Sequence, residues 1–329
     1  MCIRDSTQPD WLTGLADIYG DFFVRQYDSA QQYYRMALQY DPWYRPAFEN
    51  AVQMYRRLDQ TSQALKWFDQ YAYFENHYPE LSLLKAICLI EKDSISQGTV
   101  LFENRFGLVV GNLVMFEMIT DLLDKKNHQQ ERARLFQLLS EIGVNNVDAM
   151  ILVAKYEINR DNIEAAGKAI EKGETINPDN VSLSVQKARI LYKTDKRDEA
   201  FEIFEKNLIE ARDEHDNNYY YSRILASEQI ELNKATNLAR KAVFVSNHDL
   251  KTWMNLCYVY FQSDRYDLCR GEALKASRKY SDDPEPFYWL GMSMYREGKE
   301  EAGENLKKSI ALGLKGENLE TARQILNKL

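Results

Sequence analysis

The sequence of 329 residues is poor in the residues that make tight turns, with 14 glycines and 7 prolines. Folds rich in β-strands need such residues about every ten positions, so a β-sandwich or barrel is excluded. The apolar share is 45%, which is ample for a buried core and excludes wholesale disorder. The chain is long enough for two or three globular domains or for one extended array.

Membrane spans, an excess of cations and catalytic motifs are also missing. No stretch approaches the roughly 18 consecutive apolar residues of a membrane helix. The 42 basic side chains are outnumbered by 50 acidic ones, which disfavours general binding to nucleic acid. The motifs GxxxxGK, GxGxxG, HExxH and GxSxG do not occur, so we expect no catalytic residues. We therefore expect a protein that is not an enzyme.

Cysteine and histidine are scarce and scattered. The four cysteines form no CxxC pair, and the four histidines fall near expected turns and not on one shared face. This pattern indicates neither a zinc site nor a disulfide framework. We expect no metal and no cofactor.

What the sequence does contain is a repeat. Starting from Tyr34, each step of 34 residues reaches another bulky apolar side chain: Phe68, Phe102, Phe136, Ile170, Phe204 and Leu238. A period of this length decides the whole fold, so it takes precedence over local motifs. Each unit contains two stretches with helical apolar spacing, separated by a short polar turn.

Two series of small residues follow the same period. One lies four residues before the bulky series and comprises Ala30, Ala64, Gly98, Ala166 and Ala200, with Arg132 as the exception. The other comprises Val52, Ala86, Thr120, Ala154, Ala188 and Ser222, and it continues after one extra residue at Cys257 and Gly291. Small residues in both helices allow the two backbones to approach closely, and the bulky side chain fills the gap beside them.

At these positions the chain resembles the tetratricopeptide repeat (TPR) family. The stretch "TWMNLCYVYFQSDRYDLC" carries Trp253, Leu256 and Tyr260 in the family's pattern, with Cys257 and Cys269 in its Gly and Ala positions. The stretch "PFYWLGMSMYREGKEEAGENLKKSI" also matches, through Leu290-Gly291. The two cysteines are either small buried residues or a disulfide that clamps one helix pair, and the sequence leaves both readings open.

The resemblance implies an all-α fold, a right-handed α-solenoid of about nine helix–turn–helix repeats. We expect the array at 7–316, with units starting near 11, 45, 79, 113, 147, 181, 215, 250 and 284. A C-terminal capping helix is expected at 317–329. Residues 1–6, "MCIRDS", match what a transposon-based sequencing adaptor encodes, so we expect a non-native segment there and do not count Cys2 as native.

In such a stack the first helices line the inner groove. The helical step of about 100° places the residues at −3, +1 and +4 from each small position on one stripe that faces this groove. In the second half of the chain the stripe and its neighbours supply cations followed by aromatic and thioether side chains. The predicted peptide-binding groove comprises Lys155, Arg189, Tyr192, Tyr219, Arg223, Met254, Tyr258, Phe261, Tyr288, Met292 and Tyr295.

Three cations on consecutive repeats, leading to an aromatic floor, suit an acidic peptide with aromatic or aliphatic anchors. We therefore expect a non-catalytic protein–protein interaction scaffold or adaptor. One alternative is the regulatory or substrate-docking arm of a larger enzyme or assembly. Another, recognition of RNA by related helical repeats, is disfavoured by the 34-residue period and the acidic balance. The sequence leaves cytoplasmic and periplasmic locations open.

Overall fold

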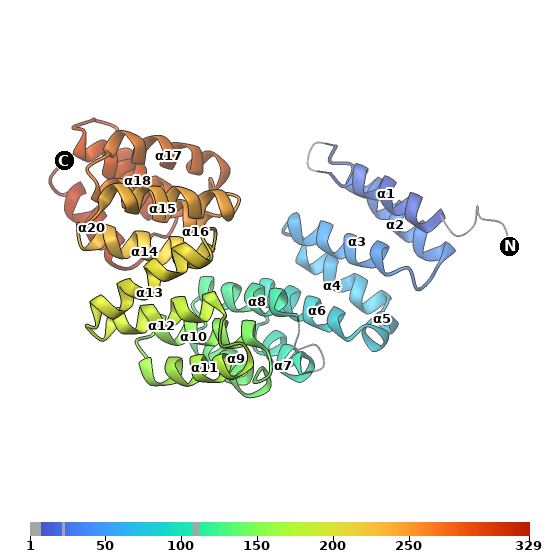
Figure 1. Ribbon diagram of the computed structural model, residues 1–329. Coiled ribbons are helices and arrows are strands. Elements are labelled where there is room, and N and C mark those ends of the chain that lie inside the picture. The colour runs from blue at the N-terminus through green and yellow to red at the C-terminus, as the bar shows by residue number, and fades with distance from the viewer. Residues whose placement is uncertain (1–7, 22–23, 108–111) are drawn as a thin grey trace. The chain divides into compact units, whose positions relative to one another are not determined.

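The computed structural model describes residues 8–21, 24–107 and 112–329. Within these ranges the chain forms twenty helices and no strand (Figure 1). It divides into two compact units, residues 1–153 and 154–329, and the boundary falls inside helix α10 (Val147–Asn159). The expected non-native segment 1–6 lies outside the described residues.

The first unit is a series of helix pairs joined by short turns. Its helices are α1 (Gln8–Tyr19), α2 (Tyr27–Tyr40), α3 (Arg45–Arg57), α4 (Thr61–Gln70), α5 (Tyr73–His77), α6 (Pro79–Glu91), α7 (Ile95–Phe106), α8 (Leu113–Lys125) and α9 (Gln129–Ile142). The helix α1 packs on α2, α3 on α4, α6 on α7 and α8 on α9. The short helix α5 is an addition that the repeat does not predict.

The second unit continues the same plan. After α10 come α11 (Ile163–Ile176), α12 (Val181–Lys193), α13 (Arg197–Glu210), α14 (His215–Ser227), α15 (Leu232–Val245), α16 (Leu250–Gln262), α17 (Tyr266–Lys279), α18 (Pro284–Arg296), α19 (Ala302–Ala311) and α20 (Gly316–Leu326). First helices also pack on first helices, α12 on α14, α14 on α16 and α16 on α18, and α20 covers α18 and α19. The prediction of an all-α stack of helix pairs with a C-terminal helix is confirmed.

The periodic side chains form the core. All seven members of the bulky series are buried, from Tyr34 to Leu238, and so are all eight members of the series from Val52 to Gly291. In the other small series Arg132 is only partly buried, as its size requires. Phe204 shows the packing: it is fully buried, and its ring stacks on that of Tyr221 with the centroids 4.9 Å apart.

The small positions are places where two helices touch. A Cβ atom added to Gly98 would lie 2.7 Å from the carbonyl oxygen of Ala86, which belongs to the other small series. A Cβ atom added to Gly291 would lie 2.7 Å from Cγ of Leu306. Both distances are too short for a real Cβ atom. Glycine therefore makes room for the backbone of the facing helix at Gly98 and for the side chain of Leu306 at Gly291.

The turn between the two helices of a pair contains a left-handed residue in every repeat. The residues with positive φ at this place are Arg25, Asp59, Asp93, Asn127, Asp161, Asp195, Gln229, Asp264 and Gly298. Most are Asp, Asn or Gly, the residue types that adopt this conformation at least cost. The spacing of 34 is visible in the sequence, but the composition of each turn alone does not reveal its φ.

We predict that truncation of the Phe204 side chain makes the helix stack less stable. Phe204→Ala should lower the free energy of unfolding by about 3–5 kcal/mol, because it leaves a cavity in a packed core. The matched control is Phe244→Ala on α15, since Phe244 is 82% exposed and its removal should change stability by less than about 0.5 kcal/mol. Urea unfolding followed by circular dichroism measures both. Equal effects of the two substitutions would contradict the assignment of the core.

We also predict that the stability of the protein depends on how well the residue at position 59 tolerates the left-handed backbone of this turn. Asp59 has φ of 54°, which a β-branched residue adopts only with strain. Asp59→Val should therefore cost about 1–2 kcal/mol of stability, whereas Asp59→Gly removes the same carboxylate at little or no cost. Thermal unfolding of the two variants tests this. A glycine variant as unstable as the valine variant would show that the carboxylate matters and the conformation does not.

Candidate functional site

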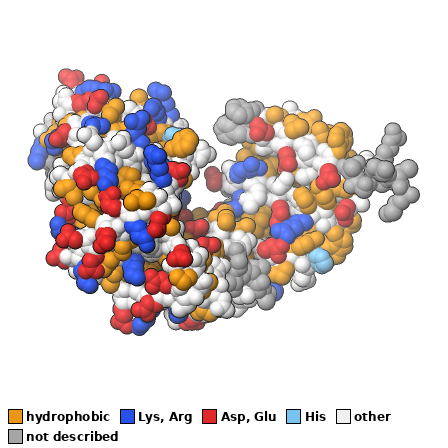
Figure 2. Space-filling view, viewed as in Figure 1, with side chains coloured by type: hydrophobic (Ala, Val, Ile, Leu, Met, Phe, Trp, Pro, Cys, Tyr) orange, Lys and Arg blue, Asp and Glu red, His pale blue; other side chains and the backbone are white. Residues whose placement is uncertain are grey.

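The first helices of the second unit enclose a cleft of about 820 Å³. Its walls come mainly from α14, α16 and α18, with contributions from the ends of α10 and α12 and from α20. The lining residues are Asn159, Arg189, Tyr219, Tyr220, Arg223, Lys251, Met254, Asn255, Tyr258, Phe261, Gln262, Glu285, Tyr288, Trp289, Met292, Glu317, Asn318 and Thr321. On the face drawn in Figure 2, acidic and basic side chains are interspersed, and no single sign dominates.

Most of the predicted groove residues lie in this cleft. They are Arg189, Tyr219, Arg223, Met254, Tyr258, Phe261, Tyr288 and Met292. The remaining three, Lys155, Tyr192 and Tyr295, are not among its lining residues.

Aromatic rings in mutual contact form one side of the cleft. The ring of Trp289 lies 5.6 Å from that of Phe261, 6.1 Å from Tyr258 and 5.0 Å from Tyr288. Such offset and edge-to-face contacts fix the rings in place and leave parts of Tyr258 and Phe261 accessible. Trp289 was not predicted, because it lies two residues before Gly291 and so outside the chosen stripe of α18.

Two exposed cations border these rings. The guanidinium of Arg223 lies 4.4 Å from the ring centre of Tyr258, and its Nη1 donates a long hydrogen bond of 3.4 Å to Asn255 Oδ1. The ammonium of Lys251 lies 5.7 Å from the ring of Tyr219. Lys251 was missed because it lies in the first turn of α16, three residues before Met254. Its position on the same face could have revealed it.

Arg189 is a correction to the predicted ladder of free cations. It is only 7% exposed, and its guanidinium lies 3.8 Å from the ring centre of Tyr220. It donates hydrogen bonds of 2.7 Å to Gln186 Oε1 and to Asn159 Oδ1. Burial lowers the pKa of Arg189, and nearby Tyr220 and Asp216 oppose that shift. Arg189 therefore connects α12 to α10 at the base of the cleft, and its guanidinium is not exposed for binding a ligand carboxylate.

Lys155 is also engaged within the protein. Its Nζ lies 2.6 Å from Oδ2 of Asp216 on α14. Tyr192 donates its hydroxyl hydrogen bond to Glu228, and Tyr295 is half-buried on α18. Of the three predicted cations, Arg223 alone combines exposure with a place in the cleft wall.

Asp216 is the centre of a buried polar network beside the cleft. Besides the ammonium of Lys155, it has Nδ1 of His215 at 3.1 Å from Oδ1 and the amide of Gln186 at 3.4 Å from Oδ2. Burial alone would raise the pKa of Asp216, but the contacts with His215 and Lys155 outweigh it and lower the pKa to about 2. Nε2 of His215 lies 3.0 Å from Oγ1 of Thr252, which links α14 to α16.

The two cysteines of the α16–α17 pair are buried, unbonded thiols. Sγ of Cys257 lies 3.9 Å from the carbonyl oxygen of Cys269, and Sγ of Cys269 lies 3.9 Å from that of Trp289. Burial raises the pKa of the Cys257 thiol. Both cysteines act as small core residues, the first of the two readings that the sequence left open.

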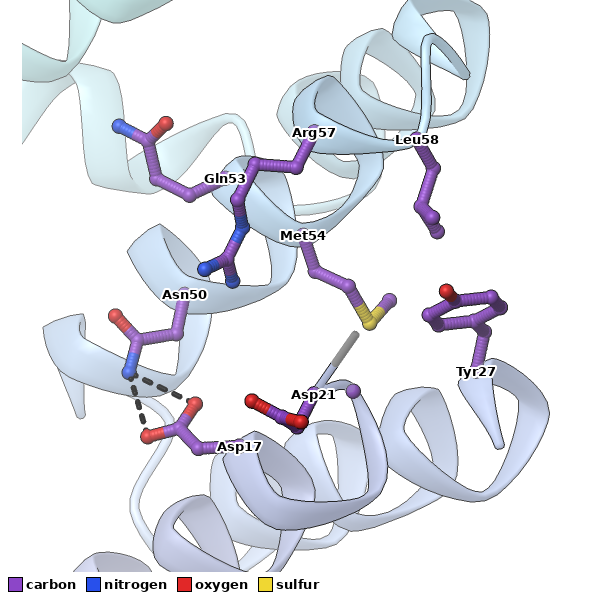
Figure 3. A pocket seen from close by; sticks show the side chains of 9 residues that line it. Asp17, Asp21, Tyr27, Asn50, Gln53, Met54, Arg57 and Leu58 are labelled. Carbon is purple, nitrogen blue, oxygen red and sulfur yellow. Dashed lines mark hydrogen bonds between the residues drawn. The ribbon is translucent and has the colours of Figure 1, made fainter. Parts of the chain in front are cut away.

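The first unit has a cleft of its own, of about 640 Å³, between α1 and α3 (Figure 3). Its side chains include Asp17, Asn50 and Arg57, and Nδ2 of Asn50 donates to both carboxylate oxygens of Asp17 at 3.1 Å. Tyr34 donates a further hydrogen bond of 2.5 Å to Asp17. This carboxylate is already well bonded, and Tyr27 is the one aromatic residue in the lining, so the aromatic cleft of the second unit is the better candidate site.

Among the described residues there is no cluster of three or more histidine, cysteine, aspartate or glutamate side chains that could hold a metal ion. Within the same ranges no helix is long and apolar enough to cross a bilayer. What the cleft offers chemically is aromatic surface, amide groups, two exposed cations and two carboxylates, which are means of binding.

The fold and the cleft define a helical-repeat protein with an aromatic cleft. No protein-family model and no curated protein matches the chain. Among solved structures, the chain is similar to yeast Tom70 at 11% identity and a TM-score of 0.48, over 98% of this chain and 95% of that one. It is also similar to a TPR protein of Thermus thermophilus at 16% identity and a TM-score of 0.45, over 55% of this chain and 99% of that one.

A tetratricopeptide repeat protein of Parabacteroides merdae is similar at 11% identity and a TM-score of 0.38, over 98% of each chain. The chain is thus similar to TPR proteins, as its sequence motifs predict. Its own helix pairs and their period carry the assignment of the repeat fold.

We predict that Asp216 stabilises the second unit in a pH-dependent way. Because its folded pKa lies below the ordinary value, its contribution is present above about pH 4 and is lost as the pH falls towards about 2. Asp216→Asn should cost about 2 kcal/mol near neutral pH, and the difference from wild type should narrow in acid.

Urea unfolding at a series of pH values between neutral and about pH 3 measures this dependence. Asp161→Asn is the control, since Asp161 forms an exposed pair with Lys193 and its left-handed φ suits asparagine. A difference between wild type and Asp216→Asn that stays constant with pH would contradict the role of the charge.

Proposed function

We propose that this protein is a non-catalytic scaffold or adaptor that binds a segment of a partner polypeptide in the cleft of α14, α16 and α18. The segment is acidic and carries an aromatic or aliphatic anchor. The observation that supports this most directly is the combination of a large aromatic cleft with Arg223 and Lys251 at its wall.

The size and composition of the cleft suit a polypeptide. A volume of about 820 Å³ accommodates several side chains. Tyrosine and tryptophan rings provide contact area at low cost in conformational entropy, and the thioethers of Met254 and Met292 adapt to the shape of an apolar anchor. The side-chain amides of Gln262 and Asn318, which also line the cleft, can exchange hydrogen bonds with a peptide backbone.

The acidic character of the segment follows from how the cations are held. A guanidinium that stacks on a ring keeps the N–H groups at its edge in the plane, where they can grip a carboxylate with two hydrogen bonds. Arg223 is held in this way on Tyr258. Its bond to Asn255 is long, so a ligand carboxylate can compete for the same group.

We predict that short fluorescein-labelled peptides with a central tryptophan flanked by glutamates bind this protein. Fluorescence anisotropy should show weaker binding when glutamine replaces the glutamates, because the contacts with Arg223 and Lys251 are lost. Tyr258→Ala and Arg223→Gln should each weaken binding of the acidic peptide about tenfold or more, since one removes the anchor surface and the other a charge.

Two variants outside the cleft serve as matched controls. Arg197→Gln removes an exposed cation that pairs with Glu228, and Tyr40→Ala removes an exposed ring at the end of α2. Both should leave affinity unchanged. Binding that is insensitive to Tyr258→Ala and Arg223→Gln, in proteins whose circular dichroism matches wild type, would refute the placement of the site.

A further inference from the structure

Besides its cations, the cleft contains two acidic side chains, those of Glu285 and Glu317. Glu285 lies in the first turn of α18, directly after Pro284, and its side chain lines the cleft together with Arg223 and Lys251. Its backbone N–H donates a hydrogen bond of 3.0 Å to Oδ1 of Asp283, which caps the helix. The hydrogen bond places the backbone of Glu285 at the N-terminus of α18, and its side chain lines the same cleft as the two exposed cations.

The groups around Glu285 shift the pKa of its carboxyl in opposite directions. Burial raises the pKa of the Glu285 carboxyl and the negative charge of Asp283 adds to this, whereas Arg223 and Lys251 lower it. The net direction is upward, so the charged form of Glu285 is less favourable here than in water. From the neighbouring elements it faces Tyr219 on α14, Tyr288 on its own helix and Glu317 on α20, which line the same cleft.

We infer that Glu285 sets the charge selectivity of the cleft, by neutralising part of the field of Arg223 and Lys251 and opposing the entry of a ligand carboxylate until it takes up a proton. The inference rests on the proposed function, because it concerns the same cleft. A carboxylate that lines the same cleft as two cations reduces the net positive charge that an incoming acidic segment meets, and like charges at a partly desolvated site repel each other.

The same arrangement predicts how the affinity for an acidic segment changes with pH. A bound acidic segment brings further negative charge next to Glu285, which favours protonation of Glu285 in the complex. Proton uptake on binding means that the affinity increases as the pH falls. The ligand's own glutamates stay ionised down to about pH 5, so the effect appears between neutral pH and that limit.

The test compares wild type with Glu285→Gln, which keeps the size of the side chain and removes its charge. The probes are the tryptophan-centred peptides with glutamate, glutamine or lysine flanks, measured by anisotropy at about pH 7.5 and about pH 5.5. Wild type should bind the glutamate peptide about two- to fivefold more tightly at the lower pH. Glu285→Gln should bind it about three- to tenfold more tightly at the higher pH, with little further change on acidification.

Glu317→Gln is the matched control, because Glu317 lines the same cleft but is exposed, so its charge is screened by water and salt. Its effect should be clearly smaller than that of Glu285→Gln. Circular dichroism of each variant verifies that the helices are intact.

Two results would overturn the inference while leaving the proposed function in place. One is unchanged or weaker binding of the glutamate peptide by Glu285→Gln, together with a wild-type affinity that does not depend on pH. The other is tight binding of the lysine peptide that Glu285→Gln abolishes, which would make Glu285 a direct contact for a basic ligand. If neither wild type nor variant binds any of the peptides, the proposed function fails and this inference fails with it.

Discussion

Each helix pair depends on a close approach of two backbones where a side chain is small or missing. At Gly98 and at Gly291 even a single added carbon would collide with the facing helix. The bulky residue one turn later, such as Phe102, fills the space beside the contact and is fully buried. Because the contact is local to a pair and recurs every 34 residues, one sequence pattern is enough to build both compact units. The left-handed residue in each turn then lets the chain reverse within a few residues.

On this framework the first helices of the second unit hold charged groups in two different ways. Two of them connect different repeats: Arg189 donates a hydrogen bond to Asn159, and Lys155 forms an ion pair with Asp216. A buried charge must be paired and hydrogen-bonded, and these side chains satisfy that condition inside the protein. Arg223 and Lys251 lie against tyrosine rings and keep their exposure. Charges that stabilise the stack are thus separated from charges that a ligand can reach.

The sequence predicted much of the cleft because aromatic and thioether residues occur at fixed offsets from the small positions. The stripe beside Cys257 and Gly291 includes Tyr258 and Met292, and both line the cleft. The same offsets do not specify how each cation is used, since a long side chain such as that of Arg189 or Lys155 reaches partners on other repeats. The offsets also missed Trp289, which lies outside the stripe but turns its large ring onto Phe261.

The sequence by itself determined the repeat and the composition of the core, because burial of one helix face is a local property with a fixed period. Only the tertiary structure decided which charged side chains form ion pairs and hydrogen bonds within the protein and which face the cleft. The physical reason is that desolvation and ion pairing depend on neighbours about one repeat or more away, as Lys155 and Asp216 show. Glu285, Arg223 and Lys251 line one cleft for the same reason, because the stack brings α18, α14 and α16 together.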